Sequence, residues 1–453
     1  MRVAHTVEQV RAAEAVALAA LPDGALMQRA AAGLAAAIAD FLGGCYGARV
    51  LLLVGPGDNG GDALYAGAML ARRGAQVEAF VLRENRYLTD FLAAGGRVVE
   101  APTRTPDVIV DGITGIGGRP GLDARIVELL ADLADVPVVA VDVPSGVDVD
   151  TGETPADFIQ ADLTTTFGTH KACHLVDPAA LACGVVHLVD LGLDLPAPPI
   201  EALTPQDVAA LLPWPSPADH KYTRGVVGVW TGSDRYPGAA VLSVAGAASG
   251  LCGMVRYAGP ALDPVRARHP DVVAGTGRVQ AWVIGSGSSE DAQAAWSHAQ
   301  GAGVPIVVDA DALGVLGDSV ATRVLTPHAG ELATLLDLDR EAIEASPLTY
   351  ARLAAERFDA VVLLKGRRSI IADPRGHARV TTSGVPWLGV AGSGDVLAGM
   401  IGALLAAGLT PFDAASVGSW LHGAAATITS DGGPITASRL AEAVPEVVRA
   451  LAD

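Results

Sequence analysis

The sequence predicts an α/β protein of two domains, each built on a parallel, doubly wound sheet. Short apolar runs alternate with helix-like segments in both halves of the chain, which is the pattern of parallel strands covered by helices. Half of the residues are hydrophobic but only 4% are aromatic, so Ala, Val and Leu build the core and 53 glycines allow close approach. A chain of 453 residues also exceeds what one core usually organises.

The first alternation fills the N-terminal part of the chain. Residues 49–54 form an apolar run closed by Gly-Pro-Gly, as expected for a strand buried on both faces. Residues 62–73 fit the helix that follows it. The strand pattern returns at 76–82, 108–110 and 136–141, with a helix-like segment at 122–133 between the last two.

A Pro-rich, irregular stretch at 193–217 disfavours a continuous helix or a central strand and marks a domain edge. We therefore expect domains at 1–205 and 206–453. The second alternation places strands at 226–230, 281–284, 306–308, 324–326 and 360–364, and a helix at 396–407. The uncharged stretch 237–255 consists of Ala, Gly and Ser rather than Leu and Phe, so it predicts a buried helix packed closely against a sheet and not a membrane span.

Net charge, the N-terminal sequence and cysteine content indicate which binding partners and which compartment to expect. A net charge of -19 argues against nucleic acid, because a binding face needs an excess of Lys and Arg. The N-terminus shows an amphipathic pattern rather than an apolar signal core, so no export is expected. The cysteines show neither CxxC pairing nor zinc spacing, which favours a reduced, cytoplasmic protein. Ala- and Gly-rich helices can pack between subunits, so a homo-oligomer is compatible with the sequence.

Two acidic, glycine-lined turns, at 55–62 and 391–395, are the most informative motifs. Each falls where a strand or loop runs into a helix, so that free backbone N–H groups can face an anion beside a carboxylate. No Gly-Lys-Ser/Thr follows the second turn, so it is not a Walker-type loop. Two separate phosphate-handling sites are therefore predicted.

Further acids follow the predicted strands of the first half. Asp111 and Asp142 each stand at the carboxyl end of a strand, where ligands of open parallel sheets collect. The alternative is that both only cap the helices that follow. His170 and His174 have the four-residue spacing of helical metal ligands, but no third ligand follows in register, which argues against a metal there.

Four ordered segments, 8–14, 25–30, 55–62 and 141–148, make residues 1–200 resemble the NAD(P)H-hydrate epimerase family. The resemblance implies a Rossmann-like three-layer sandwich that interconverts the R and S forms of NADH and NADPH hydrates (NADHX and NADPHX). It also implies a K⁺ ion held by Asn59, Asp111 and Ser145. By the same resemblance, the substrate contacts Asp58, Asn59, Gly60, Gly61, Asp62, Gly115, Ile116, Gly117, Gly118, Arg119, Pro120, Gly121 and Asp142.

Epimerisation needs a group that takes and returns a proton, and Asp142 is the best candidate, with Lys171 as its candidate partner. The sequence departs from the family at Asp58, where a second Asn is usual, and at Ala63, where Gly is common. A carboxylate at position 58, close to a bound phosphate, is expected to affect the choice between substrates and the pH dependence of the reaction.

In the second half, Asp395 begins a helix behind small residues whose amides can face a transferring phosphate. This turn resembles the ribokinase-like superfamily, where such an Asp is the base. Six ordered segments between 219 and 450, among them 309–313, 326–331 and 364–366, resemble ADP/ATP-dependent NAD(P)H-hydrate dehydratases within it. Ser393 and Ser369 stand where Thr is common and change little.

The resemblance implies that Asp395 is catalytic and that ADP, with Mg²⁺, is the co-substrate. It places the nucleotide against Lys365, Gly366, Arg367, Arg368, Ser369, Gly392, Ser393 and Gly394. It places the hydrated substrate against Ala239, Gly287, His328 and Asp395. Simpler alternatives stay open: His328 as a turn cap, Asp309 and Asp311 as strand-end acids without a ligand, and Lys365 as a solvated charge.

The sequence therefore predicts a bifunctional enzyme of nicotinamide nucleotide repair, an isomerase fused to a lyase that releases AMP and phosphate from ADP. The main alternative is a vitamin or small-molecule kinase of the ribokinase-like class with a nucleotide-binding regulatory domain. A third is a nucleotide-sensing scaffold in which both acids are dispensable. The sequence does not fix ADP over ATP, NADH over NADPH hydrate, or the oligomeric state.

Overall fold

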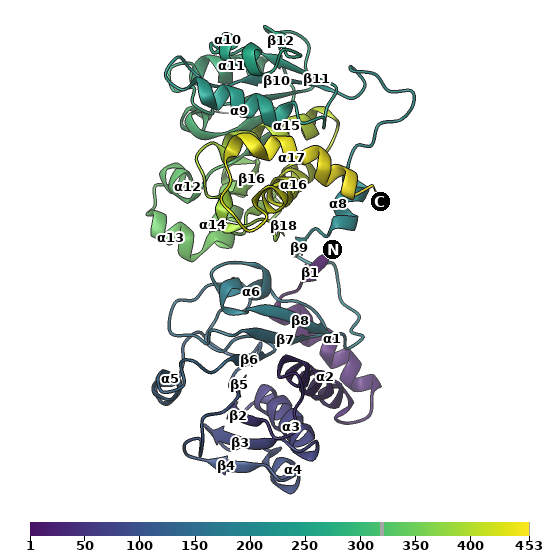
Figure 1. The fold of residues 1–453 in the computed structure, drawn as a ribbon, viewed down its shortest axis with the longest axis vertical. Coiled ribbons are helices and arrows are strands. Elements are labelled where there is room, and N and C mark those ends of the chain that lie inside the picture. The colour runs from purple at the N-terminus through teal and green to yellow at the C-terminus, as the bar shows by residue number, and fades with distance from the viewer. Residues whose placement is uncertain (318–320, 453) are drawn as a thin grey trace. The chain divides into compact units, whose positions relative to one another are not determined.

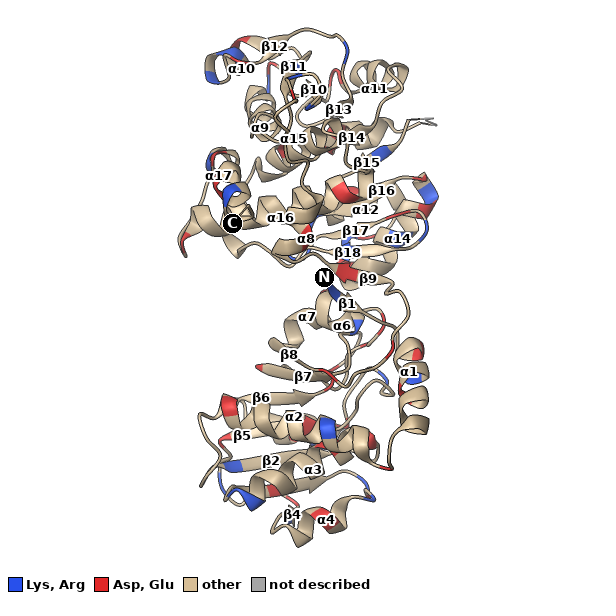
Figure 2. Ribbon diagram, turned by 90° about the vertical axis from the view of Figure 1, so that its right-hand side faces the viewer, with Lys and Arg blue, Asp and Glu red and all other residues tan. Residues whose placement is uncertain are grey.

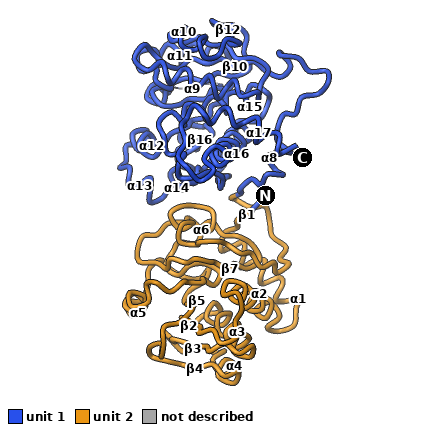
Figure 3. The backbone as a smooth tube through the Cα atoms, in the orientation of Figure 1, with its two compact units in different colours: residues 1–2, 201–453 blue, residues 3–200 orange. Residues whose placement is uncertain are grey.

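A computed structural model describes residues 1–317 and 321–452. The chain forms two compact units, one of Val3–Ile200 and one of Met1–Arg2 with Glu201–Asp453 (Figure 3). Each unit has its own sheet.

The first unit is a three-layer α/β sandwich (Figure 1). β1 (Arg2–Ala4) is not a strand of this unit's sheet, whose strands lie in the order β4-β3-β2-β5-β6-β7-β8, and every pair in that order is parallel. The strands are β2 (Arg49–Val54), β3 (Gln76–Val81), β4 (Arg97–Val99), β5 (Val108–Gly112), β6 (Val138–Val141), β7 (Leu163–Phe167) and β8 (Val185–Val189). The helices are α1 (Val7–Ala20), α2 (Ala25–Phe41), α3 (Asp58–Arg72), α4 (Leu88–Ala93), α5 (Ala124–Ala131), α6 (Ala172–Leu175) and α7 (Ala179–Ala182).

Strand β2 shows why its sequence is apolar throughout. Val50, Leu52 and Val54 point to the face covered by α2 and α3. Leu51 and Leu53 point to the opposite face, where they pack with Ile126 of α5. Because successive side chains of a strand alternate between faces, a sheet covered on both sides needs an unbroken apolar run.

The second unit carries a larger, mixed sheet. From β9 on, its strands follow the order β9-β18-β17-β16-β15-β14-β13-β10-β11-β12. The strands from β16 to β12 are parallel to one another, β17 pairs antiparallel with β16, and β18 pairs antiparallel with β17. The strands are β9 (Ile200–Ala202), β10 (Val226–Trp230), β11 (Met254–Tyr257), β12 (Val273–Ala274), β13 (Ala281–Ile284), β14 (Ile306–Val308), β15 (Arg323–Leu325), β16 (Val361–Leu364), β17 (Ile370–Ala372) and β18 (Ala378–Val380). The helices are α8 (Pro205–Leu211), α9 (Pro237–Ala247), α10 (Leu262–Arg268), α11 (Ala292–Gly301), η1 (Ala310–Val315), α12 (Ala329–Leu336), α13 (Arg340–Ala345), α14 (Pro347–Phe358), η2 (Pro386–Leu388), α15 (Ser393–Ala406), α16 (Pro411–Ser430) and α17 (Ala437–Ala450).

Helices α9 and α15 pack backbone against backbone. A Cβ at Gly246 would lie 2.0 Å from the Val396 carbonyl oxygen, and one at Gly399 would lie 2.0 Å from that of Ser243. The stretch 237–255 is therefore a buried helix only as far as Ala247. The chain then turns through Gly250, which has a φ of +90°, and enters the sheet as β11. The prediction of one helix over 237–255 is therefore wrong beyond Ala247.

The predicted α/β fold with two doubly wound domains is confirmed. Helices α3 and α15 begin earlier than predicted, at Asp58 and Ser393, because their glycine-rich first turns carry no apolar periodicity. The irregular stretch 193–217 holds the short elements β9 and α8. Within residues 1–317 and 321–452, no helix has the length and hydropathy to cross a bilayer. Lys and Arg are dispersed over many elements (Figure 2).

Both sheets reverse their strand order at one point. β2 lies between β3 and β5, and β10 lies between β11 and β13. Ligands of open α/β sheets bind at the carboxyl ends of strands beside such a reversal. The topology therefore directs attention to the loops after β2, β5 and β6 in one unit and after β10, β13 and β14 in the other.

Candidate functional site

In the first unit, the glycine-rich turn after β2 is packed too closely for side chains. A Cβ at Gly55 would lie 1.8 Å from the Ile113 carbonyl oxygen, and one at Gly60 would lie 2.2 Å from that of Gly55. The Asn85 amide, absent from the predicted site, fixes the turn by donating to the carbonyls of Gly55 (2.9 Å) and Gly57 (3.0 Å). The turn is thus held in one conformation before any ligand binds.

Asn59 and Asp62 extend from the first turn of α3 into the same region. Asn59 Nδ2 and Asp62 Oδ1 are among the buried side-chain atoms of the described residues that lack a hydrogen-bond partner. A Cβ at Gly115 would lie 2.8 Å from Asn59 Oδ1, so the predicted substrate loop 115–121 starts against this amide. Asp58 is exposed and pairs with Arg86 at 2.8 Å. Buried polar atoms without partners are costly unless a ligand satisfies them.

Asp111 is fully buried at the end of β5 and is bound to Ser145. Its carboxylate accepts from the Ser145 hydroxyl (2.6 Å) and backbone N–H (2.7 Å), and from the Ile113 N–H (3.2 Å). Burial raises its pKa to about 6 against these hydrogen bonds. Helix α5 is capped by Asp123, so Asp111 does not cap the helix that follows it. Asp111 instead lies within β5 and connects the loops after β5 and β6 through its hydrogen bonds to Ser145.

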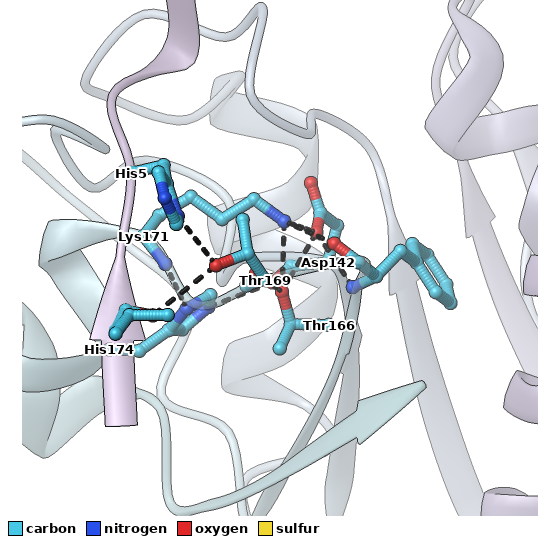
Figure 4. A network of polar contacts seen from close by, with 8 residues as sticks. His5, Asp142, Thr166, Thr169, Lys171 and His174 are labelled. Carbon is cyan, nitrogen blue, oxygen red and sulfur yellow. Dashed lines mark hydrogen bonds and ion pairs between the residues drawn. The ribbon is translucent and has the colours of Figure 1, made fainter. Parts of the chain in front are cut away.

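Asp142 and Lys171 form a buried ion pair (Figure 4). Lys171 Nζ donates to Asp142 Oδ1 at 2.5 Å and also to the Thr166 hydroxyl (3.0 Å) and the Phe167 carbonyl (3.1 Å). Thr166 donates to the same carboxylate oxygen at 3.0 Å. Asp142 follows β6 with a φ of +67° and caps no helix.

Opposing effects set the charge state of this site. Burial favours the neutral acid, but the charge of Lys171 and its hydrogen bond hold the pKa of Asp142 below its usual value. Burial and then the nearby charge of Asp142 raise the pKa of Asp62 well above its usual range. The same two causes raise the pKa of Glu14, a residue of α1 that the prediction omitted. The site thus combines an ionised acid with acids that favour protonation.

In the second unit, Asp309 is the buried centre of a polar cluster at the end of β14. Its Oδ1 accepts from Lys365 Nζ (2.8 Å) and the Thr326 hydroxyl (2.8 Å), and its Oδ2 accepts from the Ser286 hydroxyl (2.8 Å). Glu331 of α12 lies 3.6 Å from Lys365 Nζ. Lys365 is accordingly largely buried among carboxylates, and their charges raise its pKa above the usual value although burial opposes this.

Asp395 lies in the first turn of α15, beside this cluster. Burial, followed by the charge of Asp309, raises its pKa to about 7 although Ser286 and Lys365 oppose the shift. Gly392 precedes the helix with a φ of +87°. A Cβ at Gly394 would lie 3.4 Å from Lys365 Nζ, so the ammonium faces the start of the helix. A carboxyl group with this pKa can exchange a proton near neutral pH.

A cavity of about 570 Å³ adjoins the start of α15. It is lined by Lys365, Gly366, Arg367, Arg368, Ser369, Ser393, Gly394 and Leu397, together with residues 381–386 and 388–389 and three residues of α16. Seven of the eight residues predicted to hold the nucleotide thus share one cavity, and Gly392 adjoins it. The cavity also includes His422, which the prediction omitted and whose pKa burial lowers to about 4.

The remaining predicted residues are distributed as follows. Ala239 and Gly287 are neighbours, since a Cβ on Gly287 would lie 2.8 Å from that of Ala239. His328 caps α12 by accepting from the Glu331 N–H at 3.1 Å, and its side chain is largely exposed. Asp311 is exposed on η1. Within the described parts of the chain, no three His, Cys, Asp or Glu side chains are grouped as a metal site.

Two different family models match the two structural units of the chain. A family model described as YjeF-related protein N-terminus matches residues 23–173, and one described as NAD(P)H-hydrate dehydratase matches 227–446. A crystal structure of an ADP/ATP-dependent NAD(P)H-hydrate dehydratase from Bacillus subtilis, co-crystallised with ATP and Mg²⁺, is 27% identical. It superposes with a TM-score of 0.53 over 55% of this chain and 98% of its own.

Two curated relatives match over nearly the whole chain. The bifunctional NAD(P)H-hydrate repair enzyme Nnr of Mycobacterium leprae is 45% identical over 100% of both chains. The Mycobacterium tuberculosis (strain H37Rv) enzyme of the same name is 46% identical over 92% of each. The recognition made from sequence motifs is confirmed, and the chain belongs to the family of bifunctional NAD(P)H-hydrate repair enzymes.

Proposed function

We propose that residues 1–205 epimerise the R and S hydrates of NADH and NADPH, and that residues 206–453 dehydrate the S form with ADP. The observation that carries this proposal is that each unit holds one buried acid with a shifted pKa: Asp142, in an ion pair with Lys171, and Asp395, which is affected by the charge of Lys365. Membership of the family supports the assignment of both activities.

In the first unit, the Asp142 carboxylate takes the proton of the ring hydroxyl as the ring C–N bond opens and the carbon becomes an aldehyde. The ammonium of Lys171, 2.5 Å from Asp142, supplies a proton to the ring nitrogen. Closure on the other face of the carbonyl reverses both transfers and restores the acid and the ammonium. The low pKa of Asp142 keeps it ionised and ready to accept at neutral pH.

K⁺ fits the predicted ligands Asn59, Asp111 and Ser145. The fully buried Asp111 carboxylate accepts three hydrogen bonds, and no charge of a Lys or Arg among the described residues offsets the effect of its burial. A buried carboxylate without a counter-charge is unfavourable, which an ion would relieve. When bound there, K⁺ would supply positive charge and order the loops after β5 and β6.

In the second unit, Asp395 takes the proton of the ring hydroxyl, and the hydroxyl oxygen bonds to the terminal phosphorus of ADP. AMP leaves with the electrons of the broken P–O bond. The new phosphate ester then loses phosphate, and the departing phosphate takes a proton from the adjacent ring carbon, which restores the double bond. Lys365 and the amides at the start of α15 face the charge that develops on the transferred group.

Mg²⁺ fits this unit through carboxylate and phosphate oxygens. Asp309 does not fit as a ligand, because both of its oxygens already accept hydrogen bonds from Lys365, Thr326 and Ser286. The Glu331 carboxylate, on the periphery of the same cluster, fits better. When bound there with the nucleotide, Mg²⁺ would neutralise phosphate charge.

The test is to supply a mixture of R and S NADPH hydrate with ADP or ATP and to measure NADPH, AMP and free phosphate. We expect one phosphate and one AMP for each NADPH formed from ADP. A phosphorylated organic product that accumulates without release of phosphate would instead identify a kinase. Equal rates with ATP, accompanied by ADP release, would correct the choice of nucleotide.

A further inference from the structure

His174 connects the backbones of the two residues that we place at the epimerisation step. The Lys171 N–H donates to its Nδ1 at 2.9 Å, and its Nε2 lies 2.9 Å from the Asp142 carbonyl oxygen (Figure 4). The side chain is buried, with 1% exposure of the residue. Of His170 and His174, for which the sequence argued against a metal, His174 thus contacts both Asp142 and Lys171.

These two contacts fix the tautomer of His174. A backbone N–H can only donate, so Nδ1 must be unprotonated, and a carbonyl oxygen can only accept, so Nε2 must carry the hydrogen. Burial, followed by the charge of Lys171, lowers the pKa of His174 to about 3, which agrees with a neutral ring. A neutral ring adds no charge beside the Asp142–Lys171 pair.

The contact to Asp142 acts at a strained position. Asp142 has a φ of +67°, which costs a non-glycine residue free energy unless its surroundings enforce it. Its backbone is held by the His174 contact at the carbonyl and by a hydrogen bond from its N–H to the Thr165 carbonyl (2.8 Å). Hydrogen bonds at both the N–H and the carbonyl of Asp142 therefore fix the backbone that carries the carboxylate facing Lys171.

The contacts form a closed ring. The ion pair joins the side chains of Asp142 and Lys171 at 2.5 Å, and His174 joins their backbones. We propose that His174 is a positioning residue for epimerisation, which sets the placement of the carboxylate and the ammonium on the substrate without touching it. This inference rests on the proposed function of Asp142 and Lys171.

The experiment compares three variants that remove the contacts separately. His174→Gln can keep a donor to the Asp142 carbonyl, His174→Asn can keep an acceptor for the Lys171 N–H, and His174→Ala keeps neither. The kcat and KM for R-to-S exchange are measured with separated epimers and without nucleotide. The matched control is Thr164→Val, which removes another buried hydrogen bond to a carbonyl of this unit, that of Cys183 at 2.7 Å.

We expect His174→Ala to lower kcat about 100-fold, as misplacement of reacting groups by about 1 Å does, with KM changed less than about threefold. Gln and Asn should each recover a part of that loss. Thr164→Val should keep the wild-type kcat in the folded fraction. A His174→Ala variant with full kcat, or Gln and Asn variants that are folded but no faster than Ala, would overturn the proposal.

Two further results distinguish a failure of the His174 inference from a failure to fold and from a failure of the proposed function. If His174→Ala does not fold, the Gln and Asn variants decide alone, because the proposal requires both to be slower than wild type at unchanged KM. If Asp142→Asn exchanges the epimers as fast as wild type in the same assay, the proposed function of the pair has failed rather than the inference about His174.

Discussion

At the scale of single residues, the two sites shift the pKa of an aspartate in opposite directions. Asp142 lies against a lysine ammonium and keeps a low pKa, whereas Asp395 is more weakly opposed by Lys365 and stands near the charge of Asp309, which together with burial raises its pKa to about 7. Environments that push apart the pKa values of like groups commonly separate their catalytic roles. The different pKa shifts of Asp142 and Asp395 are therefore consistent with a different reaction in each unit.

The raised pKa of Asp395 predicts the pH dependence of dehydration. The base acts only when it is ionised, so the rate should fall about tenfold per pH unit below pH 7 and become level above it. The measurement is the pH profile of kcat for S hydrate with ADP. A rate that stays level from pH 5 to pH 8 would argue against Asp395 as the base.

Asp142→Asn should lower R-to-S exchange at least about 100-fold, because the group that takes the proton is lost. It also leaves the buried Lys171 without its counter-charge, so the first unit should lose stability. The measurement is exchange between separated epimers, together with thermal unfolding.

The matched control is the double variant Asp142→Asn with Lys171→Met, which removes both charges. It should regain stability but not exchange. Rapid exchange by this double variant would contradict the assignment of both residues.

At the scale of elements, the turn into α15 depends on Gly392. Its φ of +87° is strained for any other residue, and a Cβ there would lie 2.4 Å from Leu242 Cδ1. Gly392→Ala should therefore cost about 1–2 kcal/mol of stability and lower the dehydration rate by displacing Asp395. Denaturant unfolding and kcat are the measurements.

Gly301→Ala, at the end of α11 where a Cβ meets nothing within 4 Å, is the control and should lower neither the stability nor kcat. If both substitutions had equal effects, the turn would not require a glycine at position 392.

Much of the fold follows from local sequence, but the assembly of the sites does not. Strands such as β2 and β10 were predicted to the residue because their apolar runs end at glycine turns or polar residues. The glycine-rich first turns of α3 and α15 were missed because the helix period starts after them. The importance of Asp142 was inferred from its place after a strand, which topology brings to the sheet edge.

The contacts that complete each site join residues that lie far apart in the sequence, so the sequence alone could not show that they meet. Lys171 lies 29 residues from Asp142, and Lys365 lies 56 residues from Asp309. Asn85, Ser286 and His422 resemble ordinary polar residues in the sequence. Only the folded chain brings Asn85 to the turn at Gly55, Ser286 to Asp309 and His422 to the cavity wall.

At the scale of the whole molecule, two units with separate cores predict that ligands stabilise them separately. ADP at about 100 times its Kd should add about 2.7 kcal/mol to the stability of the second unit. For a unit of this size, that corresponds to a rise of about 5–10 °C in one of two melting transitions. Calorimetry with and without ADP is the measurement. An equal rise in both transitions would indicate that the units unfold as one or that ADP binds to both.

The central claim is that one chain holds two independent sites that act in sequence on one substrate. The most direct measurement supplies pure R hydrate and ADP to the Asp142→Asn variant, to the Asp395→Asn variant and to their mixture, and follows NADPH formation. Neither variant alone should form NADPH faster than spontaneous epimerisation allows, and the mixture should restore it with S hydrate as an intermediate. NADPH formation at the wild-type rate by either variant alone, or none from the mixture, would contradict the claim.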